Sequence, residues 1–578
     1  MADLSADTTL GPRRPRLKAG VIWLAAPAVL LLLAFMVYPM AEIFRLAVVD
    51  QTGFTWKYMA KAMSPGLYAR VLGTTFSVSL QVTLWCIVLG YPLAYWLAGL
   101  RGRPQRVALF FILLPFWTSA LIKNFSWMVV LGRNGIVAQW VEALGLGKAD
   151  GLLYNQTTVI FAMVHTMLPL AVITMLPVIR QIDPRLYPAA MTLGASGPRA
   201  FWQVMIPLSM RGISSASLLI FVASLGFFVT PSLVGGPKQT MIGQLIIMQI
   251  NQLQNWSQGA ALAVMLLLAA LVSVFVFDRI FGISSVADAS ARPHDSRIRR
   301  FGLWLSDGVG ALADRLPAGL GRPTLNLFAG VMILILMLPI IAFVPMAFSA
   351  TPELRFPPQG FSLQWFHELF TSQIWLGAIT RSLLIGFATA ALTVVIGTLA
   401  AVALARSKSK AGTPVFLLIL SPMIIPPIAL AVSMFYLFAK IGLIASNLGI
   451  IIGHSVIALP IVFVILLTTV KGYDWRLNDA ALTLGASRAQ VWRKVALPIL
   501  QGGLAAGFVT GFLQSFEELT VALFIGGGLK TTLPRQMWDS ILLQATPIIA
   551  CASVVMLLIV MVFFGLLELS QSRRSKKH

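Results

Sequence analysis

The chain has 578 residues, of which 58% are hydrophobic and only 11% are charged, and its mean hydropathy is +0.85. A soluble globular chain carries about 25% charged residues, so this composition excludes an ordinary soluble protein. Runs of roughly 20 apolar residues recur along the chain and predict membrane-spanning helices. The net charge of +23 does not predict a nucleic-acid partner, because basic residues in a membrane protein mark cytoplasmic loops.

The apolar runs predict twelve spans, six in each half of the chain. In chain order they are 21–47, 71–98, 107–131, 157–179, 212–233, 258–280, 325–349, 376–404, 414–439, 448–470, 501–525 and 546–569. The first run is longer than the apolar region of a signal peptide, so we expect it to remain as an uncleaved span. If the N-terminus lies inside, 30 of the 43 Lys and Arg face the cytoplasm, which predicts that both termini are cytoplasmic.

The two halves are repeats. Pro169 matches Pro460 and Ser224 matches Ser515, both 291 residues apart, whereas Gly90 and Gly397 are 307 apart. Because each half has an even number of spans, the repeats share one orientation. The predicted fold is an all-α integral membrane protein with about twelve helices in two parallel six-helix repeats. Its expected segments are a cytoplasmic tail (1–20), a first transmembrane domain (21–280), a cytoplasmic linker (281–324), a second transmembrane domain (325–570) and a basic tail (571–578).

Apolar residues recur near helical spacing between Phe301 and Leu316 in the expected linker. They predict an amphipathic helix that lies on the inner membrane surface or packs against the protein.

One cytoplasmic loop occurs twice. Residues 189–207 and 480–498 align without a gap, with 9 identities in 19 positions. Each copy begins with an Ala pair that favours a short helix, then has a glycine that permits a sharp change of direction, and ends in a proline. A single copy is explained equally well as a docking point or as an interfacial turn that only connects two spans. Two copies at equivalent places predict two docking points for one partner.

The loops resemble the coupling loop of ABC importer permeases, in which Glu-Ala-Ala and three residues precede a Gly, and nine residues then lead to an apolar-x-apolar-Pro ending. Gly194 is followed by nine residues and Val204-Met205-Ile206-Pro207, and Gly485 by nine and Val495-Ala496-Leu497-Pro498. The acidic position holds Pro188 in the first copy and Asp479 in the second. The residues that the resemblance assigns to ATPase coupling are Ala189, Ala190, Gly194, Pro207, Asp479, Ala480, Ala481, Gly485 and Pro498.

The resemblance implies a type I importer of the bacterial inner membrane. Its partners would be a cytoplasmic ABC ATPase dimer that binds ATP and Mg²⁺, a periplasmic or extracellular solute-binding protein, and the lipid bilayer. The chain has no phosphate-binding GxxxxGK[ST] motif, so we expect no enzyme activity, catalytic residue, metal or cofactor in the chain itself.

Three stretches narrow the resemblance to the polyamine (spermidine/putrescine) type, with two permease halves fused in one chain. They are LPFWTSALIKNFSWMVVLGRNG (114–135), TPSLVGGPKQTMIGQLI (230–246) and SFEELTVALFIGGGLKTTLPRQMW (515–538). The resemblance implies a polyamine or related amine as solute. Amino-acid derivatives, aminophosphonates and ferric iron remain open.

Candidate residues of the solute path are Glu517 and Glu518, which fall inside the predicted eleventh span. An acidic residue at the bilayer centre costs about 2.5–3.5 kcal/mol on insertion scales, so such a residue faces a pathway or a partner. Two carboxylates suit a cationic solute. The alternatives are that they pair with a buried Arg or Lys, or cap a broken helix.

The third and fifth predicted spans hold further candidates. Lys123 is a path candidate, although we expect its long side chain to extend toward the outer face. Phe227 and Phe228 either line a cavity or pack within the bundle. His165 and His454 do not align under the repeat, and we expect each to be a hydrogen-bonded buried histidine rather than a metal ligand.

Two other classes of protein compete with the importer hypothesis. A twelve-span secondary transporter driven by an ion gradient shares the span count and the parallel repeat, but it does not predict matching loops after the fourth span of each half. A membrane-embedded enzyme requires a cluster of acidic, His or Cys residues, which the sequence does not suggest.

Overall fold

The computed structural model describes residues 19–51, 53–133, 135–145, 151–281, 321–407, 409–528 and 530–575. The predicted amphipathic helix between Phe301 and Leu316, most of the predicted N-terminal tail and of the linker, and the last three residues of the predicted C-terminal tail lie outside the described residues. Within them the protein is almost entirely helical, with a single two-residue hairpin, β1 (Val49–Asp50) and β2 (Gly53–Phe54).

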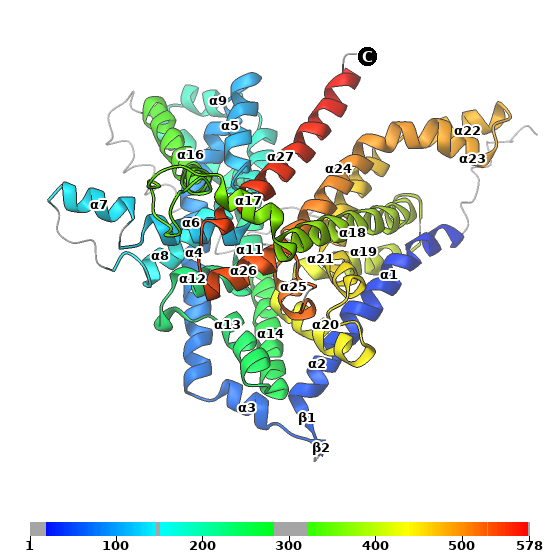
Figure 1. Ribbon diagram of the computed structural model, residues 1–578. Coiled ribbons are helices and arrows are strands. Elements are labelled where there is room, and N and C mark those ends of the chain that lie inside the picture. Colours follow the sequence, from blue (N-terminus) through cyan, green and yellow to red (C-terminus); the bar gives the residue numbers. More distant parts are fainter. Residues whose placement is uncertain are drawn as a thin grey trace, which may run out of the picture.

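The first half consists of α1 to α14 with several short 3-10 or π turns (Figure 1). Its elements are η1 (Ala19–Ala25), α1 (Ala26–Leu32), η2 (Leu33–Val37), α2 (Tyr38–Val48), α3 (Lys57–Met63), α4 (Leu67–Ala98), α5 (Arg103–Leu113), α6 (Ala120–Val130), α7 (Ile136–Ala143), α8 (Gln156–Gln181), α9 (Leu186–Thr192), α10 (Gly197–Ala200), η3 (Phe201–Met205), α11 (Ile206–Leu225), α12 (Val229–Val234), η4 (Pro237–Gln239), α13 (Ile242–Ile247), η5 (Met248–Gln252) and α14 (Trp256–Phe281).

The second half repeats this order from α16 onward, without a counterpart of α7. Its elements are α16 (Gly321–Met346), α17 (Gln364–Thr371), α18 (Gln373–Arg406), α19 (Gly412–Leu420), η7 (Ser421–Met423), α20 (Pro427–Ile441), α21 (Asn447–Lys471), α22 (Arg476–Thr483), α23 (Arg488–Val491), η8 (Trp492–Ala496), α24 (Leu497–Phe516), α25 (Thr520–Ile525), α26 (Leu533–Leu543) and α27 (Ile548–Ser575).

Nine helices among the described residues are long and apolar enough to cross a membrane, and a tenth span is counted if a bent pair is taken as one. The predicted third span is two 11-residue helices, α5 and α6. The predicted ninth span is bent by 98° between Met423 and Pro427. Proline explains both breaks: Pro115 and Pro422 stand at equivalent places, and each lacks the backbone N–H that a continuous helix needs.

The predicted boundaries of the fifth and eleventh spans are wrong. The helices run over Gly197–Leu225 and Arg488–Phe516 rather than 212–233 and 501–525. Pro207 and Pro498 do not end a helix, because a π turn precedes each: in the first, the Ile206 N–H bonds to the Phe201 carbonyl five residues back. The wide turn accommodates a proline ring that would otherwise clash with the helix. The polar loop is therefore continuous with the span.

Each half has a core of three helices, α4, α8 and α11 in the first and α18, α21 and α24 in the second. Glycines permit this close packing. A Cβ at Gly90 would lie 3.1 Å from the Ala171 Cβ, and one at the equivalent Gly397 would lie 3.1 Å from Leu466 Cδ1.

The first span of each half crosses over to the other half. The segment from η1 to α2 packs on α18 to α21, and α16 packs on α4, α5 and α6. The two halves are thus interlocked, and their contact surface runs through the middle of the molecule.

Candidate coupling loops and solute path

The two repeated loops fold into the same elbow. In the first, α9 ends before Gly194, whose φ is +93°, and α10 leads into the long helix to Leu225; in the second, α22 ends before Gly485, whose φ is +85°. A Cβ at either glycine would meet no atom within 4 Å. The glycine is required by the left-handed backbone and not by crowding, since residues with a Cβ resist that conformation.

Side-chain hydrogen bonds order two places in each elbow, one before its first short helix and one at the start of its second. The Asp183 carboxylate accepts a hydrogen bond from the Arg185 N–H at 2.9 Å, and Asp474 accepts from the Arg476 N–H at 3.0 Å. Beyond the glycine, Ser196 and Ser487 each accept from the backbone N–H three residues later. Such caps satisfy N–H groups that the start of a helix leaves unpaired. Each elbow is therefore a defined structure.

Apolar side chains project from both elbows at the same three positions. Leu193 and Leu484 are 89% and 88% exposed, although each stands beside the turning glycine. The other exposed pairs are Leu186 with Leu477 and Met191 with Leu482. Exposed apolar side chains at matching positions of two ordered loops are a distinctive feature of this surface. The six residues form two equivalent surfaces, which we call the elbow leucine patches.

The elbows differ in how they are anchored to the spans. In the first, the Tyr187 hydroxyl donates to the Gly197 carbonyl at 3.1 Å. The Phe201 ring packs against the Tyr95 ring, with 5.1 Å between the ring centroids. In the second, the ring of Trp475 packs edge-on against that of Trp492, the counterpart of Phe201, with 6.4 Å between the ring centroids. Pro188 and Asp479, which stand where the coupling-loop pattern has Glu, are both exposed.

The acidic pair lies at a helix break and not within a continuous helix. The long helix ends at Phe516, and the short helix α25 begins at Thr520. Glu518 caps α25: its carboxylate accepts from the Val521 N–H at 2.9 Å and from the Ala522 N–H at 3.2 Å. A negative charge at a helix start also interacts favourably with the helix dipole. Glu518 is therefore a helix cap, which is one of the alternatives that the sequence left open.

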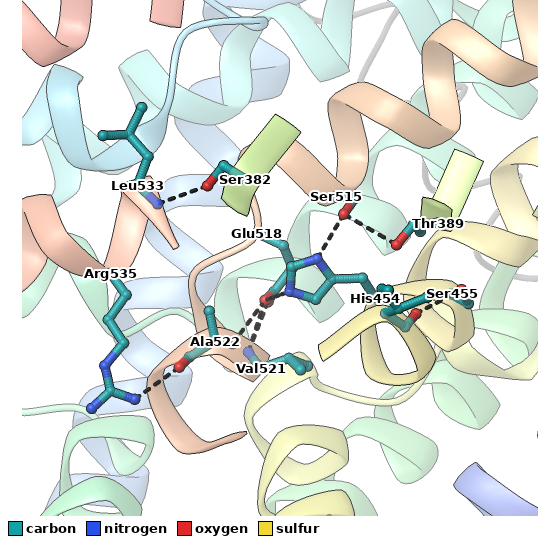
Figure 2. A network of polar contacts seen from close by, with 11 residues as sticks. Ser382, Thr389, His454, Ser455, Ser515, Glu518, Val521, Ala522, Leu533 and Arg535 are labelled. Carbon is teal, nitrogen blue, oxygen red and sulfur yellow. Dashed lines mark hydrogen bonds and ion pairs between the residues drawn. The ribbon is translucent and has the colours of Figure 1, made fainter. Parts of the chain in front are cut away.

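A buried histidine holds this cap in place. Figure 2 shows His454 between two partners, with Nε2 3.2 Å from the Glu518 carboxylate and Nδ1 2.7 Å from the Ser515 hydroxyl. Ser515 in turn contacts Thr389 at 3.4 Å. At the other end of α25, the Arg535 guanidinium donates to three carbonyls, those of Ala522, Leu523 and Gly526. Charged groups thus secure both ends of one short helix.

Glu517 has a different environment. Its Oε1 is buried and has no hydrogen-bond partner among the described residues. Its carboxylate interacts electrostatically with Lys123 of the first half. Lys123 does not extend to the outer face as expected: it is 3% exposed, and its ammonium donates to the Pro115 carbonyl at 2.9 Å. The carbonyl is available because α5 and α6 are separated at Pro115, which draws Lys123 inward.

The equivalent break in the first half is apolar. Gly226 and Phe227 stand where the second half has Glu517 and Glu518. A Cβ at Gly226 would lie 3.1 Å from the Pro426 Cβ and 3.2 Å from the Pro427 Cδ of the other half. Phe228 is buried, with its ring 5.7 Å from Trp538 of α26. The breaks of both halves therefore lie at the contact between the halves.

A family model matches this chain twice. The model for "Binding-protein-dependent transport system inner membrane component" matches residues 90–285 and again residues 393–576. The chain belongs to this family of ABC importer permeases. Each match covers one half, so the chain is two permease halves in one polypeptide, as the repeat predicted.

Relatives of the permease match one half each. Spermidine/putrescine transport system permease protein PotB of Salmonella typhimurium (strain SL1344) is 33% identical over 227 residues, which is 39% of this chain and 79% of PotB. Permease protein PotC of Escherichia coli (strain K12) is 29% identical over 227 residues, which is 39% of this chain and 86% of PotC.

Among solved structures, one of a bacterial alginate ABC transporter in complex with an alginate pentasaccharide-bound periplasmic protein resembles the permease. It has 17% identity and a TM-score of 0.39, and the match covers 44% of this chain and 91% of that one.

The sequence predicted that both His165 and His454 are buried, but it did not predict the partners that they contact. His454 was expected to be buried and hydrogen-bonded, and it is, but nothing in its spacing indicated that Glu518 is its partner. His165 is buried, with Nε2 3.2 Å from the Leu336 carbonyl. The described residues contain no group of three or more His, Cys, Asp or Glu side chains arranged to hold a metal ion.

Proposed function

We propose that the chain forms the membrane path of an ATP-driven importer whose ATPase subunits are separate polypeptides. The single observation that carries this proposal is the pair of equivalent elbow leucine patches. Two matched apolar surfaces suit a partner that itself has two equivalent subunits. Each patch is joined through Gly194 or Gly485 and an unbroken helix to a break at the contact between the halves. A movement of the elbow is thereby passed to the centre of the membrane.

In this account both elbows and both termini lie in the cytoplasm, and a solute-binding protein delivers the solute on the other side. The partner ATPase binds ATP and Mg²⁺ and performs the hydrolysis. Pro188 in the first loop replaces an acidic residue, so contact of that loop relies on the apolar patch. The second loop has Asp479 in addition.

We propose a polyamine or a related small amine as the solute. The names of the PotB and PotC relatives support this class, and so does the Glu517 carboxylate at the contact between the halves. Glu518 is engaged by α25 and His454, which leaves Glu517 as the carboxylate that meets a cationic solute. Phe227 and Phe228 stand at the equivalent break of the first half, and Lys123 is the cation that balances Glu517 when no solute is bound.

Uptake in cells tests the energy source against the rival secondary transporter. Radiolabelled spermidine is supplied to cells that express the chain with its ATPase and binding protein, and ATP is depleted in one arm while a protonophore collapses the ion gradient in another. We expect uptake to fall with ATP and to persist with the protonophore while ATP is maintained. Uptake that follows the gradient and ignores ATP contradicts the proposal.

A further inference from the structure

The outer segment after the first span is also repeated in both halves. Exposed apolar residues recur 307 positions apart: Phe54 and Phe361 are 77% and 76% exposed. The other exposed apolar pairs are Trp56 with Leu363, Met63 with Phe370, and Leu67 with Ile374. We call these two sets the outer apolar segments. None of the residues belongs to the elbows or to the breaks.

Both segments are ordered by equivalent contacts. The Thr55 N–H donates to the Val48 carbonyl at 2.8 Å, and the equivalent Ser362 N–H donates to the Phe348 carbonyl at 2.7 Å. The short helices that follow, α3 and α17, each bury one face, with Ala62 and the equivalent Leu369 fully covered. They pack on the last spans of their own halves, α14 and α27. This packing fixes the orientation of both helices, so the opposite face of each is exposed.

The position of these segments indicates what covers them. Figure 1 shows β1, β2 and α3 at the far end of the molecule from α9 and α22 of the elbows. The spans α4 and α18 begin directly after α3 and α17. The exposed Leu67 lies on the same side of α4 as the exposed Trp85 and Val88, five to six turns further along. The first outer apolar segment is therefore continuous with the lipid-facing side of α4, and the second stands at the equivalent place before α18.

We propose that the two outer apolar segments are interfacial anchors that lie in the headgroup region of the outer leaflet. Phe and Trp side chains beside a span are typical of that region, where apolar rings reach the acyl boundary. Amphipathic helices lie flat in it, and α3 and α17 each add one large exposed apolar side chain, Met63 and Phe370, to those before and after them. Each anchor ties the segment before α4 or before α18 to the membrane surface, while the elbows move.

The anchors differ in charge, which makes the proposal specific. Exposed Lys57 and Lys61 of α3 have Gln364 and Glu368 as their counterparts in α17. Lysines at a membrane surface are attracted by anionic lipids. The first anchor should therefore bind more firmly when anionic phospholipid is present, and the second should not.

Site-specific fluorescence tests the location. Phe54→Cys and Phe361→Cys, each in the full chain, are labelled with a small polarity-sensitive dye; the cysteines of the native sequence, Cys86 and Cys551, are buried. The labelled proteins are placed in phosphatidylcholine vesicles with and without phosphatidylglycerol. Quenching is measured with a headgroup nitroxide lipid and with aqueous iodide. Leu193→Cys, at the tip of an elbow, is the control for a side chain in water.

We expect the nitroxide lipid to quench both anchor labels several-fold more than the Leu193→Cys label, and iodide to quench them less. Phosphatidylglycerol should increase lipid quenching at position 54 and leave position 361 unchanged. If iodide quenches both anchor labels as strongly as the control and the lipid does not, the segments lie in water, free for a protein partner, and the proposal is wrong. Equal responses of both labels to phosphatidylglycerol would overturn the charge argument.

Discussion

The elbows and the helix breaks have diverged to different extents. Both elbows have the same turning glycine, the same caps and the same exposed apolar positions. At the breaks, by contrast, Gly226 packs on Pro426 and Pro427, whereas its counterpart Glu517 is a carboxylate near Lys123. The same helices connect the two regions. Symmetry is thus kept where a symmetric partner is proposed to bind and lost where the proposed solute passes.

The short helices after the breaks differ in the same way. Glu518 and Arg535 hold the two ends of α25. Their counterparts at α12 are Phe227 and Gln244, which carry no charge. One side of the contact between the halves is therefore secured by charged side chains, and the other by uncharged ones. This asymmetry predicts that matched substitutions in the two halves have unequal effects.

The largest effect is expected at the elbow leucine patches. Leu193→Asp with Leu484→Asp should abolish ATPase association, since the loss of one interface hot spot costs about 2 kcal/mol, or about 30-fold in affinity. Each single variant should lose about 30-fold, because the elbows are equivalent. Binding of the ATPase subunit to the immobilised chain measures this. Leu144→Asp, at an exposed position directly after α7 and outside the elbows, is the matched control, and normal ATPase binding by the double variant would contradict the docking proposal.

The next effect is expected at Glu517. Glu517→Gln keeps the size of the side chain but removes the charge that interacts with buried Lys123, whose ammonium keeps only its hydrogen bond to the Pro115 carbonyl. The thermal midpoint should therefore fall, and uptake should fall by more than the loss of folded protein accounts for. Uptake of radiolabelled spermidine should fall about 30-fold, since a bond to a charged group contributes about 2 kcal/mol. Measurement of uptake against the thermal midpoint in detergent separates the two. A variant that transports normally would remove Glu517 from the solute path.

Glu518→Ala should act mainly on stability. It removes the cap of α25 and leaves His454 without its carboxylate, at a cost of about 2 kcal/mol. The thermal midpoint should fall, and uptake should decrease in proportion to the folded protein. Loss of uptake with an unchanged midpoint would instead make Glu518 a solute contact.

The smallest effect is expected at the uncharged break. Gly226→Ala brings a methyl group 3.1 Å from the Pro426 Cβ, and such overpacking costs about 1 kcal/mol. Uptake should fall about fivefold, if the halves must move against each other here. Gly330→Ala, in a helix where a Cβ meets nothing within 4 Å, is the control. Equal behaviour of the two alanine variants would show that the Gly226 contact does not limit transport.

The sequence predicted the class of fold, the repeat and the family, because these rest on apolar runs and on a repeated motif with fixed spacing. The predicted fifth and eleventh spans are misplaced, because the helices that contain Pro207 and Pro498 begin in the repeated loops and end at Leu225 and Phe516. Proline usually marks a helix boundary, but a preceding π turn lets the helix continue. The spacing of the prolines alone does not reveal such a turn.

The candidate residues of the solute path were only partly separable from the sequence. Glu517 and Glu518 are adjacent and chemically identical, yet one caps a helix and the other approaches Lys123. Which of the two glutamates caps the helix depends on where α25 begins and on His454, which lies 64 residues away in the chain from Glu518. The inward turn of Lys123 depends on the break at Pro115. Both are consequences of packing between helices that no local pattern encodes.

Reconstitution tests the central claim most directly, namely that this chain is driven through its elbows by a separate ATPase. The purified chain is placed in proteoliposomes alone, under an imposed ion gradient, and together with the ATPase subunit, ATP and a spermidine-loaded binding protein. We predict no ATP hydrolysis and no spermidine accumulation by the chain alone, and accumulation with ATP consumption by the assembly. Accumulation by the chain alone, driven by the gradient, would contradict the account.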